Sequence, residues 1–354
     1  MKKILHGLGL ASLCALFLCS EANAAPRQII LFVASGMGPE HARLGGCLQN
    51  GKEGSLSFES FPYRTLIGNN AADKAIPDAA AAGTAMATGK RVNTRVISKN
   101  MPGDGSDLET ALESYKKQNF STGLISTAYI EHPVTAAFAS HAASKRDYDS
   151  ILSEIYRKTR PDILLGGGKK TGVPPPEGYL LVKDTAELQK TSPKAGQKIF
   201  GRFGEMYTPY DLEAMPQIPR LSQMTKEAIR LMEWNQKGMF LVIESARLDH
   251  ASVIGNVEIA AGEMAELSRA VDIAAKWAKG RPDAMVLVTS DLETGGLKLE
   301  GPCAEKKFAS AQFTKKDHTG SKVPLYGMGK GAEAVKAARE NTDIYKILMG
   351  RSVK

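Results

Sequence analysis

Residues 76–90 read I-P-D-A-A-A-A-G-T-A-M-A-T-G-K, a turn followed by a run of small residues that favour a helix. Asp78 follows a proline and is predicted to cap the start of this helix, and Gly89 is predicted to end it. Free backbone N–H groups converge on the first helical residue, which makes that position suited to an anion or a nucleophile. Here it is Ala79, and taken alone the stretch fits an ordinary packed alanine-rich helix better.

Continuous apolar runs elsewhere in the chain indicate strands that are covered on both faces. These runs are residues 27–33, 122–127, 162–165, 239–243 and 284–289. Helical patterns lie between them, at residues 108–117, 146–158, 223–236 and 257–279. Alternation of this kind predicts an α/β fold with a mainly parallel central sheet and helices on both faces, whose site lies beyond the carboxyl ends of the strands.

Polar residues follow several of these predicted strands. Ser35 follows the first, Glu244 and Asp249 follow residues 239–243, and Asp291 follows residues 284–289. Each residue by itself is typical of a turn or a helix cap. Their shared place at the strand ends favours a functional site there.

The N-terminal segment has the pattern of a signal peptide. Lys2 and Lys3 precede an apolar run at residues 4–18, and Ala22-Asn23-Ala24 resembles a signal-peptidase site. We therefore predict a signal peptide at residues 1–24 and a single domain at residues 25–354, exported to the periplasm or secreted. A lipoprotein anchor at Cys19 is the alternative. Since no other apolar run approaches about 20 residues, the exported chain is not expected to be an integral membrane protein.

Charge and cysteine content limit the function classes. Removal of Lys2, Lys3 and Glu21 with the signal peptide lowers the formal net charge from +8 to +7. The basic residues form no cluster with interleaved aromatic residues, so we expect no nucleic-acid partner. Cys47 and Cys303 remain, and they could form a disulfide in an oxidising compartment, although their spacing does not establish it.

Several motifs together resemble the alkaline phosphatase family. Residues 78–85, D-A-A-A-A-G-T-A, match a family signature D-S-A-A-x-x-T-A except at the serine that becomes phosphorylated. Further matches are F-S-T-G-L-I-S-T at 120–127, L-L-G-G-G at 164–168, P-R-L-S-Q-M-T at 219–225, D-L-E-T-G-G at 291–296 and H-T-G at 318–320. The resemblance covers nearly all of residues 25–354 and implies an alkaline-phosphatase-like fold.

The resemblance also implies a site with two zinc ions and a nearby magnesium ion, each held by side chains such as His, Asp and Glu. The aligned positions are Asp249, Val253 and His318 for the first zinc, Ser35, Asp291 and Leu292 for the second, and Ser35, Val134 and Glu244 for magnesium. Ala79 stands at the nucleophile and Lys145 at the phosphate clamp. Asp249, His318, Asp291 and Glu244 are thus the surviving ligand positions, and Ser35, Val134, Val253 and Leu292 are lost ones.

These losses predict a pseudo-phosphatase with a binding or accessory role toward an unknown ligand or protein partner. We expect no metal or one weakly bound divalent cation, with Arg247, Lys145 and His318 as possible internal partners of the remaining carboxylates. The alternative is an active phosphomonoesterase that uses zinc and magnesium, aided by neighbouring groups at His132, Thr135, His250 or Glu293. A residue next to a ligand position in the sequence usually points in another direction, which weighs against replacement of the lost ligands by these neighbours. A purely structural envelope protein is a third class.

Overall fold

A nine-stranded sheet organises the computed structural model, which describes residues 25–168 and 173–353. The strand order across the sheet is β2-β13-β8-β1-β7-β3-β4-β6-β5. The strands are β1 (Gln28–Ala34), β2 (Tyr63–Ile67), β3 (Ser121–Ser126), β4 (Ile163–Gly167), β5 (Tyr179–Val182), β6 (Lys198–Phe203), β7 (Met239–Ser245), β8 (Ala284–Thr289) and β13 (Val323–Gly329). The signal peptide predicted at residues 1–24 lies outside the described residues.

The strands from β8 to β5 in this order are all parallel to their neighbours. All five strands expected from the sequence belong to this block. The block also contains β5 and β6, which were not predicted. Two further strands, β13 and β2, add antiparallel pairs beside β8 and were not predicted either. Ala34 at the end of β1 is in register with Ser245 at the end of β7, so the loops after these strands emerge side by side.

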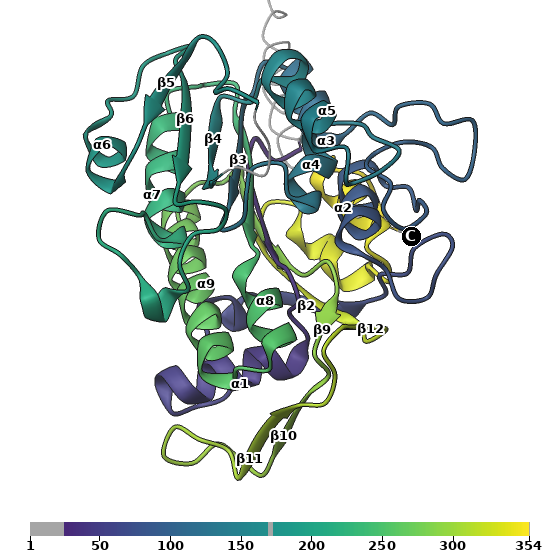
Figure 1. The fold of residues 1–354 in the computed structure, drawn as a ribbon, viewed down its shortest axis with the longest axis vertical. Helices are drawn as coiled ribbons and strands as arrows, with labels where there is room; N and C mark the ends of the chain where they lie inside the picture. The colour runs from purple at the N-terminus through teal and green to yellow at the C-terminus, as the bar shows by residue number, and fades with distance from the viewer. Residues whose placement is uncertain (1–24, 169–172, 354) are drawn as a thin grey trace, which may run out of the picture.

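Helices cover both faces of the sheet, as the sequence predicts (Figure 1). Alternate residues of β1 show the two faces. Ile30 and Phe32 pack in the core that includes residues of α1, α7 and α9, whereas Ile29 and Leu31 pack in the core that includes residues of α2, α3, α4, α5 and α10. Because a strand covered on both faces gains no stability from a polar face, its sequence is apolar throughout.

Most of the helices are short. The longest helix, α9, packs on the face of the sheet that α1 and α7 also cover (Figure 1). The expected helix at residues 146–158 is observed as α5 followed by a π-helical turn, η2 (Ile155–Thr159). The helices are α1 (Pro39–Asn50), α2 (Ala79–Thr88), α3 (Ala111–Lys117), α4 (Pro133–Ala139), α5 (Tyr148–Glu154), α6 (Thr185–Lys190), α7 (Leu221–Met232), α8 (Arg247–Ile254), α9 (Val257–Ala278) and α10 (Thr342–Leu348), with 3₁₀ turns η1 (Ser57–Ser60), η3 (Asp211–Glu213) and η4 (Ala332–Ala337). Within the described ranges, no helix is long and apolar enough to cross a membrane.

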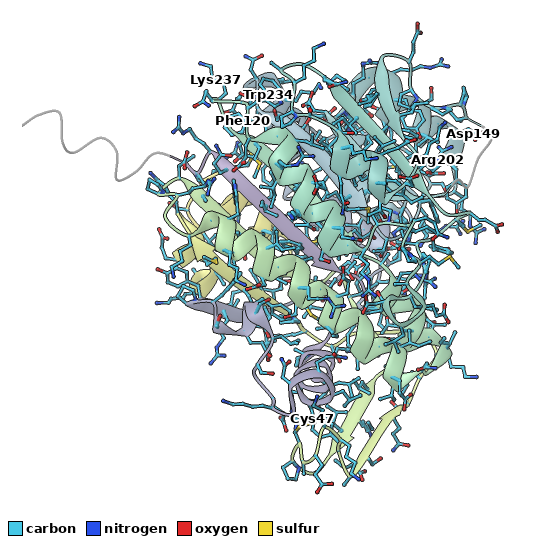
Figure 2. All side chains as sticks on the ribbon, turned by 90° about the vertical axis from the view of Figure 1, so that its left-hand side faces the viewer. Cys47, Phe120, Asp149, Arg202, Trp234 and Lys237 are labelled. Carbon is cyan, nitrogen blue, oxygen red and sulfur yellow. A yellow bond between two sulfur atoms is a disulfide. The ribbon has the colours of Figure 1, made fainter. Side chains whose placement is uncertain are left out.

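Two small antiparallel ribbons extend from the strand-end side of the sheet. The hairpin of β10 (Leu297–Glu300) and β11 (Ser310–Phe313) projects from the body, whereas β9 (Glu293–Thr294) pairs with β12 (His318–Thr319) beside the sheet (Figure 1). Cys47 on α1 forms a disulfide with Cys303 in the hairpin loop. Figure 2 shows Cys47 on α1, close to this hairpin. The disulfide therefore ties the hairpin to the helical layer, which answers the question that the cysteine spacing left open.

Candidate functional site

The start of α2 forms one wall of the site. The Asp78 carboxylate accepts a hydrogen bond from the Ala81 N–H at 3.0 Å, and Gly89 ends the helix with a left-handed φ of 74°. Both caps are therefore confirmed. Ala79 is the first residue of the helix, and its methyl group occupies the position that the resemblance assigns to a nucleophile.

A solvent-open hollow at the strand ends brings many of the predicted positions together, with an empty volume of about 780 Å³ that includes open solvent. It is lined by Ser35, Ala79, Tyr129, His132, Pro133, Lys145, Arg146, Tyr148, Asp249, Asp291, Leu292 and His318. Glu244 lies fully buried behind this lining. Val134 and Val253 are not part of the lining.

Glu244 has hydrogen-bond partners at both carboxylate oxygens. Oε1 lies 2.5 Å from His132 Nδ1 and accepts from the Ser35 hydroxyl at 3.2 Å, while Oε2 accepts from the Ser126 hydroxyl at 2.7 Å. Burial lowers the pKa of His132, but the charge and hydrogen bond of Glu244 outweigh this and raise it overall. Both oxygens of Glu244 are thus engaged by protein groups.

His132 was considered only as a neighbouring group that would point elsewhere, and the structure instead directs it at Glu244. The residue immediately precedes α4 and begins no recognisable motif. The available signal was its place in the loop after β3, which is another strand end.

Asp291 is 1% exposed, and among the described residues only one of its carboxylate oxygens has a hydrogen-bond partner. Oδ1 accepts from the Leu292 N–H at 2.8 Å and from the Gly36 N–H at 3.3 Å. Oδ2 has no hydrogen-bond partner among the residues that the structure describes. Burial, followed by the negative charges of Asp249 and Glu244, raises the pKa of Asp291 to about 7.

Asp249 on α8 contacts the β9–β12 ribbon. Its Oδ1 accepts a hydrogen bond from the Thr294 hydroxyl and lies 3.7 Å from His318 Nε2. Because His318 and Thr294 are opposite each other in that ribbon, the pairing of β12 with β9 places both groups beside Asp249.

The other expected partners of the carboxylates pair elsewhere. Lys145 Nζ lies 2.8 Å from Asp78 Oδ2, and the Arg247 guanidinium stacks 3.5 Å from the centre of the Tyr210 ring. Of the internal pairings that we expected, only that of His318 with Asp249 is therefore present in the described structure.

The remaining neighbouring groups make contacts with residues outside the ligand positions. His250 contacts Arg247 and the Tyr207 ring, Glu293 accepts from Thr319 and from the Leu297 N–H, and Thr135 donates to the Ile130 carbonyl.

The residues present do not fit the ion set that the resemblance implies. Leu292 is 1% exposed and offers only hydrocarbon, and the Glu244 oxygens are already engaged by His132, Ser35 and Ser126. Over residues 25–168 and 173–353 no three His, Cys, Asp or Glu side chains are grouped so that they could hold a metal ion.

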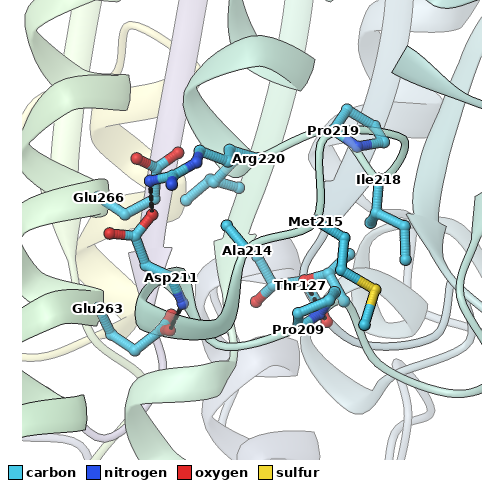
Figure 3. A pocket seen from close by; sticks show the side chains of 12 residues that line it. Thr127, Pro209, Asp211, Ala214, Met215, Ile218, Pro219, Arg220, Glu263 and Glu266 are labelled. Carbon is cyan, nitrogen blue, oxygen red and sulfur yellow. Dashed lines mark hydrogen bonds and ion pairs between the residues drawn. The ribbon is translucent and has the colours of Figure 1, made fainter.

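A second and smaller hollow is lined by residues of η3, α7 and α9 (Figure 3). Asp211, Glu263, Glu266 and Arg220 line it. It contains none of the residues predicted for the site.

Comparisons with known proteins agree on one family. A protein-family model described as alkaline phosphatase matches residues 26–177 and 175–343. Alkaline phosphatase 4 of Bacillus subtilis is 27% identical, with 93% of this chain and 90% of the relative covered. The alkaline phosphatase of Escherichia coli is 25% identical, with 92% and 86% covered.

Solved structures of the same family share the fold. A cold-active alkaline phosphatase from Shewanella sp. has a TM-score of 0.81 at 22% identity, covering 91% of this chain and 98% of that one. The Thermus thermophilus alkaline phosphatase has a TM-score of 0.80 at 16% identity, covering 94% and 92%.

Proposed function

The chain belongs to the alkaline phosphatase family, and from that premise we propose that it is an exported pseudo-phosphatase, which binds a ligand in the strand-end hollow without hydrolysing phosphate monoesters. The observation that carries the proposal is Ala79 at the first residue of α2. A methyl group cannot attack phosphorus, so the covalent route of a serine nucleophile is closed.

The metal-ligand positions support the same proposal. In the family two metal ions would activate the nucleophile and the leaving group. In this chain Leu292 and Val253 supply no donor atoms, and Glu244 is engaged by His132, Ser35 and Ser126. We therefore propose that the protein holds no metal or one weakly bound divalent cation.

One observation favours the alternative function, an active metal-dependent phosphomonoesterase. Asp249, Asp291 and His318 still line one hollow, and these are residue types that zinc accepts. Activity by this route would need a water nucleophile in place of the side chain lost at Ala79.

The deciding experiment combines elemental analysis of the purified protein with an aryl-phosphate assay. We expect turnover several powers of ten below that of the Escherichia coli relative, because the nucleophile is missing. Comparable turnover that a chelator and Asp249→Ala both abolish would overturn the proposal. Two or three equivalents of zinc and magnesium retained through dialysis would promote the alternative.

Restoring the nucleophile alone tests the contribution of the metal positions. Ala79→Ser is expected to remain inactive, because a serine hydroxyl needs a metal or a base to become an alkoxide. The minimum repair combines Ser35→Asp, Ala79→Ser, Val253→His and Leu292→His. Strong zinc-dependent hydrolysis by the single variant would show that our assignment of ligand positions is wrong.

Export is tested by N-terminal sequencing of the protein recovered from a periplasmic extract. The proposed cleavage after Ala24 predicts a chain that starts at Ala25. A chain that retains residues 1–24, or one that starts at a lipid-modified Cys19, contradicts it.

A further inference from the structure

Two kinds of charged group line the strand-end hollow. Asp249 comes from α8, which follows β7, and Asp291 comes from the loop after β8, whereas Lys145 and Arg146 come from the segment before α5. A ligand that fills the hollow therefore meets carboxylates from one set of loops and cationic side chains from another.

The carboxylate side has an unfilled hydrogen-bond acceptor. Asp291 Oδ2 has no partner among the described residues, although Asp291 is 1% exposed and lines the hollow. A buried carboxylate oxygen without a donor is costly, so this atom is suited to a ligand that brings an N–H group. Glu244 needs no donor from a ligand, because both of its oxygens already have hydrogen-bond partners in His132, Ser35 and Ser126.

An ammonium group fits this demand better than a divalent cation does. Zinc needs about three protein ligands at fixed distances, and although Asp249, Asp291 and His318 line the hollow, no three His, Cys, Asp or Glu side chains within the described ranges are grouped so that they could hold an ion. A primary ammonium presents three N–H donors on one atom. One such group can therefore donate hydrogen bonds to both Asp291 and Asp249.

The cationic side is suited to an anion. Lys145 makes one ion pair, with Asp78, and its ammonium has further N–H donors. The Arg146 side chain is exposed and makes no hydrogen bond or ion pair with any residue in the described ranges. Ala79 adds the N-terminal end of α2, a ten-residue helix whose dipole favours negative charge.

We infer that the hollow binds a small zwitterion, with a primary ammonium group against Asp291 and Asp249 and a phosphate monoester against Lys145 and Arg146. This inference rests on the proposed function, since a ligand is bound and kept intact. The organic ammonium takes the place that metal ions hold in a complete family site.

Calorimetric titration with matched probes tests the inference. O-phosphoethanolamine carries both groups, ethyl phosphate lacks the ammonium, ethanolamine lacks the phosphate, and phosphocholine lacks the N–H donors. We expect O-phosphoethanolamine to bind roughly tenfold more tightly than any of the other three, because each of them leaves charged partners unpaired. Equal affinity for ethyl phosphate would overturn the inference.

Variants assign the two ends of the ligand. Asp291→Asn should reduce the affinity for O-phosphoethanolamine to that for ethyl phosphate, and Arg146→Gln should weaken both phosphates together. Asp283→Asn and Arg157→Gln change a carboxylate and an arginine outside the hollow and should leave both affinities unchanged. If Asp291→Asn alters neither affinity, the carboxylate does not hold the ammonium and the inference fails.

Two further outcomes separate this inference from the proposed function. Titration with Zn²⁺ or Mg²⁺ alone that saturates at one tight equivalent and blocks O-phosphoethanolamine would assign Asp291 to a metal and overturn the inference. Hydrolysis of bound O-phosphoethanolamine, detected as released inorganic phosphate, would refute the pseudo-phosphatase proposal while the ligand assignment stands. Vesicles that contain phosphatidylethanolamine test whether the ligand is a lipid headgroup. Binding to the vesicles without binding of free O-phosphoethanolamine would contradict a small ligand.

Discussion

Two groups of three carboxylates lie in different parts of the molecule, and they have different kinds of partner. The strand-end cluster consists of Glu244, Asp249 and Asp291, and the imidazoles of His132 and His318 lie beside Glu244 and Asp249. The arginine-paired cluster consists of Asp211, Glu263 and Glu266 (Figure 3).

A guanidinium group links two members of the arginine-paired cluster, Asp211 and Glu266. Arg269 Nη2 lies 2.6 Å from Asp211 Oδ2 and its Nε lies 2.7 Å from Glu266 Oε2, and Arg220 pairs with the other oxygen of Asp211. Arginine can bridge two carboxylates because its donors form a rigid fork. Glu263 accepts the Asp211 N–H at 2.8 Å.

The comparison shows what an incomplete set of partners means in each place. Burial raises the pKa of Glu263 and of Asp291 to about 7 in both cases. Asp291, whose Oδ2 has no partner among the described residues, lines a hollow about 780 Å³ in empty volume, whereas Glu263 lines a smaller one of about 310 Å³. A buried carboxyl group with a raised pKa therefore belongs to our proposed ligand site in one cluster and represents a structural cost in the other.

The largest expected effect is a pH-dependent loss of stability caused by Glu263. Its pKa rises from an ordinary 4.5 to about 7 on folding, so the stability that it contributes is complete below about 4.5 and is lost as pH rises through 7. The difference corresponds to about 3 kcal/mol. Glu263→Gln should flatten the fall in unfolding free energy between about pH 5 and about pH 8, measured by urea denaturation.

Glu258→Gln, in the exposed first turn of the same helix, is the matched control and should preserve the wild-type pH dependence. A Glu263→Gln profile that runs parallel to that of the wild type would contradict the assigned burial of charge.

The next effect tests the arginine fork. Arg269→Ala leaves Asp211 and Glu266 short of a partner, and we expect a loss of about 2 kcal/mol of unfolding free energy. This lies below the usual cost of breaking a buried ion pair because the Arg269 side chain is 46% exposed. The measurement is the urea midpoint at constant slope.

Lys276→Ala removes an exposed ion pair with Asp272 on the same helix and should change stability by less than about 0.5 kcal/mol. If Lys276→Ala and Arg269→Ala cost the same, the arginine fork has no special role.

The smallest effect has the opposite sign and concerns the strand-end cluster. Asp249→Asn should be tolerated or should stabilise the metal-free protein by about 1 kcal/mol, since it removes repulsion with Asp291 and Glu244. Thermal unfolding in the presence of a chelator measures this change in stability.

The control, Asp162→Asn, breaks a contact of 2.5 Å with Lys198 and should destabilise the protein. A large loss of stability in Asp249→Asn, reproduced by a chelator in the wild type, would indicate that a metal is bound there.

Local patterns predicted much of the sheet and of α2. The apolar runs that indicated strands all belong to the parallel block, because burial on both faces requires apolar residues at every position. The strands β2, β5, β6 and β13 escaped prediction. In β2 half-buried and exposed residues alternate up to the buried Ile67, and its place at the sheet edge depends on β13, which lies far along the chain.

The site was predicted in outline but not in its contacts. The motif alignment named Asp249, Asp291, His318 and Ala79, which line one hollow. It did not identify Thr294 as a donor to Asp249, nor Lys145 as the partner of Asp78. A motif aligns positions along the chain and carries no information about side-chain direction.

The sequence by itself determined the α/β alternation and the caps of α2, because strand burial and helix capping act between residues close in the chain. Only the tertiary structure decided that His132 meets Glu244, 112 positions away, and that Cys47 meets Cys303, 256 positions away. Such contacts depend on where whole strands and helices pack. Local propensity contains no record of that packing, so the partners of the buried charges became known only from the folded chain.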